Sequence, residues 1–120
     1  MASALTIIIA DDHPLFRGAL KQALTGMAGN PDIVEAGDFE AARKAAAANA
    51  NADLLLLDLA MPGVSGLSGL ISLRAEFQSL PVVIVSASDD PATIRRALDL
   101  GASGFISKSA SIEDIREGIS

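Results

Sequence analysis

The feature that most constrains the fold is a run of four leucines, residues 54–57, that ends abruptly at Asp58. Four consecutive apolar residues leave no polar face, so the run predicts a central strand of a parallel sheet covered by helices on both sides. Met61, Pro62 and Gly63 then turn the chain. Open α/β sheets bind ligands at the carboxyl ends of their strands, which makes Asp58 a candidate functional residue.

Apolar segments alternate with segments of helical periodicity along the whole chain. The predicted strands cover residues 5–10, 33–36, 54–57, 80–86 and 104–107. The predicted helices cover residues 14–27, 39–49, 67–77, 91–100 and 112–119. This alternation predicts an α/β fold, a doubly wound (βα)5 domain with a five-stranded parallel sheet. Right-handed crossovers with one change of winding direction give the strand order 2-1-3-4-5.

Composition limits the classes of function that this chain can have. The formal net charge of −6 argues against direct binding to a nucleic-acid phosphate backbone. The absence of cysteine excludes disulfides and thiolate metal sites. No apolar stretch approaches the roughly 20 residues that span a bilayer, and no signal-peptide pattern is present. We therefore expect a soluble domain without membrane contact, located in the cytoplasm.

The predicted topology brings several polar residues to one edge of the sheet, namely Asp11, Asp12, Asp58, Ser86 and Lys108. Three carboxylates in one cleft repel one another unless a cation neutralises them. Hard oxygen ligands in this number suit Mg²⁺, which commonly bridges to a phosphate oxygen. A lysine and a hydroxyl beside them can stabilise a transferring phosphoryl group. The residues therefore fit a carboxylate nucleophile that accepts such a group.

These five residues, each at a strand end and in this order, resemble the receiver domain of two-component response regulators. The likeness covers essentially the whole chain and implies a flavodoxin-like fold. Residues 11–17 and 101–108 resemble the NarL/FixJ subfamily more narrowly, whose receivers usually precede a helix-turn-helix DNA-binding domain.

The resemblance implies a role for each matching residue. Asp58 would accept a phosphoryl group from a sensor histidine kinase or a small phosphodonor. Asp12, Asp58 and the backbone carbonyl of Ala60 would bind Mg²⁺, and Asp11 would act through water. The protein would then be a signalling switch and not an enzyme that turns over external substrates.

Further residues would transmit the modification. Ser86 and Lys108 would stabilise the phosphoryl group, and Phe105 would turn inward as the aromatic switch. In the family, Thr is frequent at the position of Ser86 and Tyr at the position of Phe105. Ser109 stands where many receivers have a proline preceded by a cis peptide bond.

The resemblance also implies partners outside this chain. Residues 1–120 would form the receiver domain, and Ser120 would be a truncation point before a helix-turn-helix output domain. That missing domain would bind DNA and regulate transcription. The C-terminal helices would provide a contact for a homodimer.

Three alternative interpretations stay open at this stage. A haloacid-dehalogenase-like phosphohydrolase also uses a strand-end Asp, although such enzymes have a second Asp where this chain has Ala60. A pseudo-receiver would share the fold without being phosphorylated. His13, the sole histidine, could ligate a metal, but its place beside Pro14 at a helix start favours a structural or modulating role.

Overall fold

The computed structural model describes residues 5–25, 31–49, 51–61, 67–87 and 90–108. The strands are β1 (Thr6–Ala10), β2 (Asp32–Ala36), β3 (Leu54–Asp58), β4 (Val82–Ser86) and β5 (Gly104–Ser107). The helices are α1 (Pro14–Thr25), α2 (Phe39–Ala48), α3 (Ser68–Glu76) and α4 (Pro91–Asp99). The predicted last helix lies outside the described residues.

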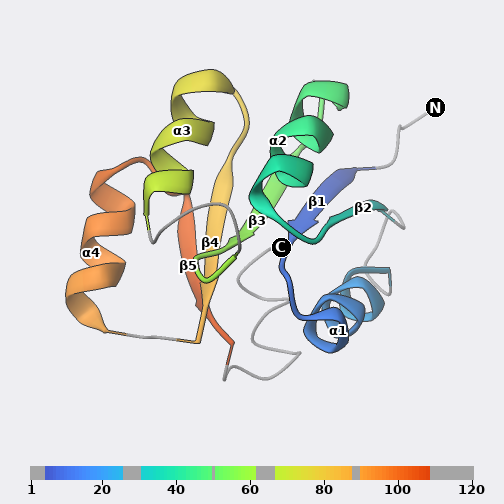
Figure 1. Cartoon of the computed structure of the whole chain (residues 1–120), viewed down its shortest axis with the longest axis horizontal. Helices are drawn as coiled ribbons and strands as arrows, with labels where there is room; N and C mark the ends of the chain where they lie inside the picture. Colours follow the sequence, from blue (N-terminus) through green and yellow to red (C-terminus); the bar gives the residue numbers. More distant parts are fainter. Residues whose placement is uncertain (1–4, 26–30, 50, 62–66, 88–89, 109–120) are drawn as a thin grey trace.

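The strands form one parallel sheet in the order β2-β1-β3-β4-β5, which confirms the predicted topology (Figure 1). In the register of β1 with β3, Ala10 lies opposite Leu57. The residues that follow these partners, Asp11 and Asp58, therefore lie side by side at the edge of the sheet, although they are far apart in the sequence. This adjacency positions the candidate site.

Helices cover both faces of the sheet, as the leucine run predicts. Alternate residues of β3 point to opposite faces, so Leu55 belongs to one core cluster and Leu56 to the other. The larger cluster packs the sheet against α2, α3 and α4, and the smaller one packs it against α1. Both leucines are almost completely buried, which explains why β3 has no polar residue before Asp58.

Two helix ends show how local sequence sets the boundaries. Asp38 caps α2, because its side chain accepts a hydrogen bond of 2.7 Å from the backbone N–H of Ala41. At the end of α4 the chain turns through Gly101, whose φ of +106° favours glycine. A Cβ there would lie 3.2 Å from Nε of Arg74, so the close approach adds a second reason for glycine.

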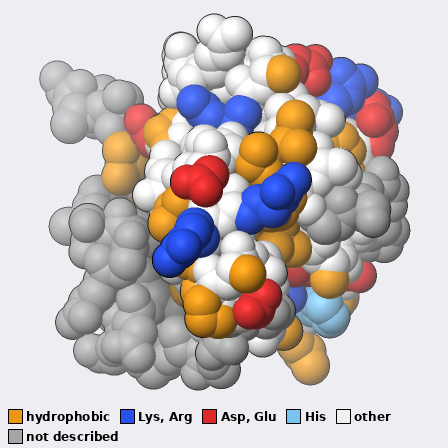
Figure 2. All heavy atoms as spheres, turned by 90° about the vertical axis from the view of Figure 1, so that its left-hand side faces the viewer, with side chains coloured by type: hydrophobic (Ala, Val, Ile, Leu, Met, Phe, Trp, Pro, Cys, Tyr) orange, Lys and Arg blue, Asp and Glu red, His pale blue; other side chains and the backbone are white. Residues whose placement is uncertain are grey.

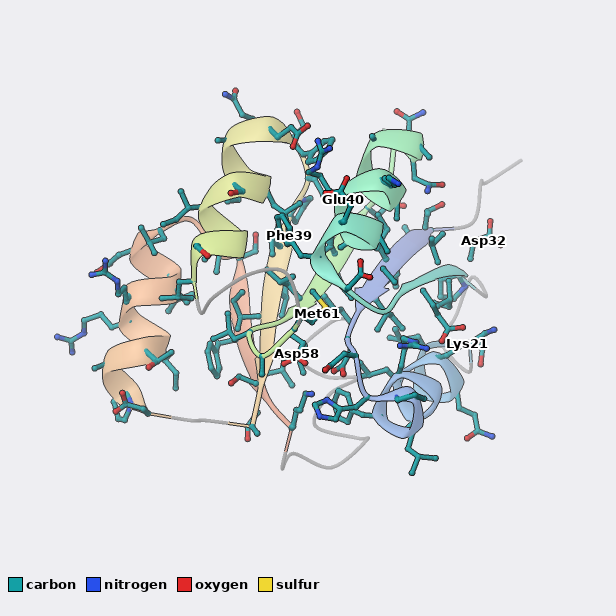
Figure 3. All side chains as sticks on the ribbon, in the orientation of Figure 1. Lys21, Asp32, Phe39, Glu40, Asp58 and Met61 are labelled. Atoms are coloured by element: carbon teal, nitrogen blue, oxygen red, sulfur yellow. The ribbon has the colours of Figure 1, made fainter. Side chains whose placement is uncertain are left out.

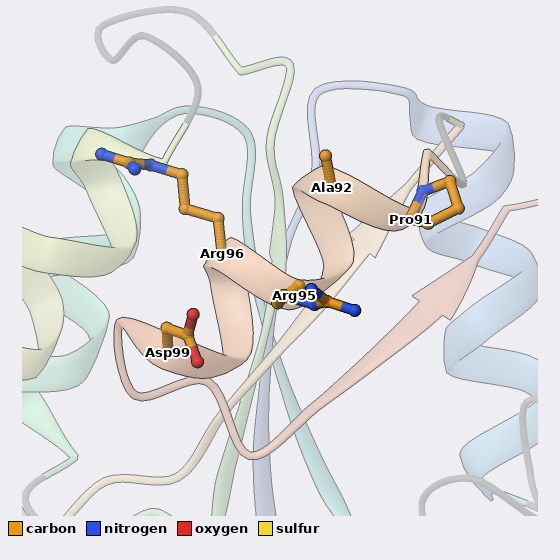
Figure 4. Close-up of a pocket in the computed structure, with 5 residues that line it drawn as sticks. All are labelled: Pro91, Ala92, Arg95, Arg96 and Asp99. Atoms are coloured by element: carbon orange, nitrogen blue, oxygen red, sulfur yellow. The ribbon is translucent and has the colours of Figure 1, made fainter.

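The outer face of α4 is open and mixed in character. Basic side chains lie among hydrophobic ones over this side of the molecule (Figure 2). A shallow hollow of about 520 Å³ is lined by Pro91, Ala92, Arg95, Arg96 and Asp99, all on this helix (Figure 4). Within the described ranges, no helix combines the length and apolar character that a bilayer crossing requires.

Candidate functional site

The candidate site lies where β1, β3, β4 and β5 end. Asp58, the last residue of β3, lies in the middle of the molecule at this edge of the sheet (Figure 3). On the next strand pair, Ser86 of β4 lies opposite Ser107 of β5. The backbone N–H of Lys108 donates to the Ser86 carbonyl at 2.8 Å, which extends the pairing into the site. The structure thus brings these predicted residues to one edge.

Three carboxylates form what we call the acidic cluster: Asp11, Asp12 and Asp58. Asp11 and Asp58 are only 1% and 2% exposed, whereas Asp12 is half-buried. One ligand atom from each, together with a ring nitrogen of His13, lies within 4.8 Å of all the others. Buried like charges this close repel each other, so the cluster favours a compensating cation.

Lys108 supplies one such cation. Its Nζ lies 2.9 Å from Oδ2 of Asp11 and 3.2 Å from Oδ2 of Asp58, so the ammonium bridges the two buried carboxylates. The same nitrogen lies 4.9 Å from the centre of the Phe16 ring, at cation–π distance. These contacts hold the ammonium inside the cleft and not in solvent.

The carboxyl group of Asp58 carries an electrostatic conflict. Burial raises its pKa, and the charge of Asp11 raises it further. The hydrogen bond from the Ala60 backbone N–H to Oδ1, at 3.1 Å, lowers the pKa, as does Lys108. The net effect is a raised pKa, which means that the ionised carboxylate is held in the cleft at a cost in free energy.

The acidic cluster fits a hard divalent cation. Three of its oxygens are buried and accept no hydrogen bond from the described residues: Oδ2 of Asp11, Oδ1 of Asp12 and Oδ2 of Asp58. Each has only an ion-pair contact with Lys108 or His13. Free carboxylate lone pairs around one point are the donor set that Mg²⁺ prefers. The residues present are therefore compatible with Mg²⁺.

His13 lies closer to the acidic cluster than the sequence suggested. Its Nδ1 is 3.0 Å from Oδ1 of Asp11 and 3.2 Å from Oδ1 of Asp12. The backbone N–H of His13 also donates to Oδ1 of Asp11 at 2.8 Å, which ties the start of α1 to the site. Sequence pattern alone could not reveal this, because it depends on how the chain turns after β1.

Arg17 also contacts the site, in a role that the sequence did not predict. Its Nη1 donates to the backbone carbonyl of Asp11 at 2.6 Å, and its Nε donates to Glu35 at 3.0 Å. The guanidinium therefore connects α1 and β2 to the loop that carries the acidic cluster. The available signal was its position one helical turn beyond His13, whose carbonyl accepts the Arg17 backbone N–H.

An open, mostly apolar cleft of about 480 Å³ gives access to Asp58. Its lining consists of His13, Leu15, Phe16, Asp58, Ala60, Ser86, Ala87 and Lys108. Phe105 is not among these residues; it is partly buried and packs against the larger core cluster. Ser109, which stands where many receivers have a proline preceded by a cis peptide bond, lies outside the described residues.

Comparison with known proteins agrees with this geometry. The response regulator receiver domain family matches residues 7–120. The glycerol metabolism activator of Pseudomonas putida is 43% identical over 94% of this chain and 51% of its own length. The nitrate/nitrite response regulator protein NarL of Escherichia coli K12 is 37% identical over 95% of this chain and 52% of its own length.

A solved structure gives the same result. The signal receiver domain of the putative response regulator NarL from Mycobacterium tuberculosis has a TM-score of 0.86 and 34% identity, covering 98% of this chain and 94% of that one. The chain spans about half the length of the curated relatives named above. On the family match, the fold and these relatives, the chain belongs to the response regulator receiver domain family and is similar to receivers of the NarL type.

Proposed function

We propose that Asp58 accepts a phosphoryl group and that this modification switches the domain between two conformations. The observation that carries the proposal is the position of Lys108, whose ammonium bridges Asp11 and Asp58 beside an open cleft. A buried carboxylate with a fixed cation and further carboxylates around it is suited to accept a phosphoryl group on one of its oxygens.

The chemistry would be an in-line displacement at phosphorus. A carboxylate oxygen of Asp58 attacks, a P–O bond forms, and the bond between phosphorus and the donor's leaving group breaks. With a phosphohistidine donor, the imidazole nitrogen leaves with the electron pair of the P–N bond. Lys108, already 3.2 Å from Asp58, would then neutralise negative charge on the transferred group.

We propose Asp12, Asp58 and the Ala60 carbonyl as the direct ligands of Mg²⁺, with Asp11 acting through water. When bound, Mg²⁺ would neutralise charge on the phosphoryl oxygens and on the carboxylates. The backbone N–H of Ala60 orients Asp58 by donating to its Oδ1. Because Ala60 lines the cleft and is exposed, water can approach the modified side chain.

The switch would use Ser86 and Phe105. Ser86 is buried at the end of β4 and lines the cleft, where its hydroxyl can donate to a phosphoryl oxygen. Phe105 lies opposite Ile84 in the β4–β5 register, and Ile84 precedes Ser86 by two residues on β4. A movement of Ser86 toward the phosphoryl group would thus alter packing around Phe105 and shift the population of conformations.

We further propose a sensor histidine kinase as the phosphodonor and transcription as the regulated output. The chain's similarity to NarL-type receivers supports both proposals. Because such kinases form phosphohistidine from ATP, we place the domain in the cytoplasm. DNA would be bound by a helix-turn-helix domain beyond residue 120. A homodimer through the C-terminal helices stays a prediction, since residues 109–120 lie outside the described ranges.

The test is phosphorylation of the purified chain by a small phosphodonor with and without Mg²⁺, followed by intact mass spectrometry. We expect one acid-labile phosphoryl group per chain, dependent on Mg²⁺ and absent in Asp58→Asn. Asp53→Asn is the matched control, because Asp53 lies at the other end of the same strand, where its carboxylate accepts from the Thr6 N–H at 2.9 Å. Stoichiometric, acid-stable modification of Asp58→Asn would refute the proposal.

A further inference from the structure

His13 has a ring nitrogen that faces the acidic cluster from outside the sheet. Nδ1 lies 3.0 Å from Oδ1 of Asp11, 3.2 Å from Oδ1 of Asp12 and 3.7 Å from Oδ2 of Asp58. His13, Asp11 and Asp12 lie in the connection between β1 and α1, whereas Asp58 ends β3. Four donor atoms from two segments therefore surround one point.

These separations match a shared coordination sphere. A small divalent cation with bonds of about 2.1 Å holds neighbouring octahedral ligands about 3 Å apart and opposite ligands about 4.2 Å apart. The distances from Nδ1 to the acidic cluster fall within this range, and all four ligand atoms lie within 4.8 Å of one another. The limit of 4.8 Å exceeds the width of such a sphere, so the four ligand atoms would draw closer together on binding a cation.

Nδ1 of His13 already lies beside a cation. Nζ of Lys108 lies 3.0 Å from Nδ1, and an ammonium group can only donate. Nδ1 also lies 3.0 Å from Oδ1 of Asp11, which can only accept, so the tautomer follows whichever contact the ring makes; the tautomer with its hydrogen on Nε2 leaves the Nδ1 lone pair for Lys108 or a metal ion. The backbone N–H of His13 holds Oδ1 of Asp11 independently, so the ring is not required for that bond. A neutral imidazole in this tautomer is a common metal ligand.

We propose that His13 is a direct ligand of the divalent cation, which makes the site a mixed oxygen–nitrogen site. Imidazole suits Ni²⁺ far better than Mg²⁺, and the affinity of such sites rises from Mn²⁺ through Co²⁺ to Ni²⁺. The site therefore binds these transition metals with an affinity that depends on His13, while its Mg²⁺ affinity depends on the carboxylates. The inference rests on the cation site of the proposed function and adds a residue that sets its metal preference.

The experiment is calorimetric titration of the unphosphorylated chain, without a histidine tag, with Mg²⁺ and separately with Ni²⁺. His13 is the sole histidine in the sequence, so no other imidazole contributes to Ni²⁺ binding. We expect His13→Leu to weaken Ni²⁺ binding by about 10- to 100-fold and Mg²⁺ binding by less than about 3-fold. Asp12→Asn, the matched variant one residue away, should weaken both.

A spectroscopic measurement gives a direct readout. With Mn²⁺ bound, pulsed electron paramagnetic resonance should detect coupling to a ring nitrogen, and His13→Leu should abolish it. Unchanged or tighter Ni²⁺ binding in His13→Leu, or an equal loss for both metals, would overturn the inference. Absence of both Mg²⁺ and Ni²⁺ binding in the unsubstituted chain would refute the proposed cation site as well. Intact Mg²⁺ binding together with Ni²⁺ binding that His13→Leu leaves unchanged would refute the inference alone.

Discussion

Two charge networks in this molecule use similar groups in opposite surroundings. On the surface, Arg43 of α2 contacts Glu40 at 3.2 Å and Glu76 of α3 at 2.9 Å, and all three side chains are 41–57% exposed. In the cleft, Lys108 contacts Asp11 and Asp58, whose side chains are each 2% exposed. Water screens the first network strongly, whereas the buried carboxylates of the second are screened far less.

The comparison teaches that burial, and not the count of charges, separates a surface ion pair from a reactive site. The two glutamates raise the pKa of Arg43, but arginine is charged at any physiological pH, so its charge is the same with or without them. In the cleft, the raised pKa of Asp58 means that the carboxylate is poorly compensated. Lys108 compensates part of this negative charge, and a metal ion can compensate the rest.

The largest effect is expected from removing the cleft's cation. Lys108→Met should lower the free energy of unfolding at pH 7 by about 3 kcal/mol, because two buried carboxylates lose their shared partner. Urea denaturation without divalent cations measures this. Lys44→Met, on the exposed surface of α2, is the control. A loss that persists unchanged at acid pH would instead indicate lost packing over Phe16.

Adding Mg²⁺ should sharpen the contrast between the two networks. At ten times its dissociation constant, a ligand of the native state stabilises it by about 1.4 kcal/mol. Thermal unfolding in MgCl₂, compared with NaCl of equal ionic strength, should show this gain and should lose it in Asp12→Ala. Glu40→Ala in the surface network should keep the gain. If it does not, the stabilisation comes from general screening.

Neutralising the acceptor should stabilise the fold. Because the pKa of Asp58 is raised in the folded state, folding favours the protonated form. The contribution of Asp58 to stability therefore falls as the pH rises from the unfolded pKa, about 4, through the folded pKa. Without Mg²⁺, Asp58→Asn should be more stable than wild type by about 1 kcal/mol at pH 7 and by nothing at acid pH. Asp53→Asn should show no such gain, and a gain independent of pH would refute the electrostatic cause.

The smallest effect is expected in the surface network. Arg43→Ala should shift the thermal midpoint by less than about 2 °C, and high salt should remove the difference, because exposed ion pairs are screened. A shift comparable with that of Lys108→Met would break the comparison, since burial would then not decide the strength of these networks.

Much of this architecture could be predicted because it depends on patterns that repeat along the chain. The leucines of residues 54–57 and the isoleucines of residues 7–9 have no polar face, so they had to form buried strands. Parallel strands place their carboxyl ends together, so Asp11, Asp58 and Lys108 could be grouped before any coordinates. Sheet order followed from chirality.

The remainder depends on local geometry that no periodicity encodes. The ring of His13 reaches the acidic cluster because its backbone bonds the Asp11 side chain, and Arg17 reaches the Asp11 carbonyl from one turn further on. Asp90 precedes Pro91 at the start of α4, a position from which a carboxylate often caps the helix. Its side chain instead accepts from the Thr93 hydroxyl and caps no backbone N–H. Such choices among nearby partners are settled by tertiary packing.

The pairing of β1 with β3 has a consequence for folding kinetics. Asp11 and Asp58 become neighbours only when strands separated by a whole strand and two helices have joined. Parallel pairings of this kind are non-local, and the cost of closing the intervening loop must be met first. A nascent chain or a collapsed intermediate holds the two halves of the acidic cluster apart. The site can therefore bind a cation or accept a phosphoryl group only after the sheet has formed. Either measurement made during refolding then reports the native fraction alone.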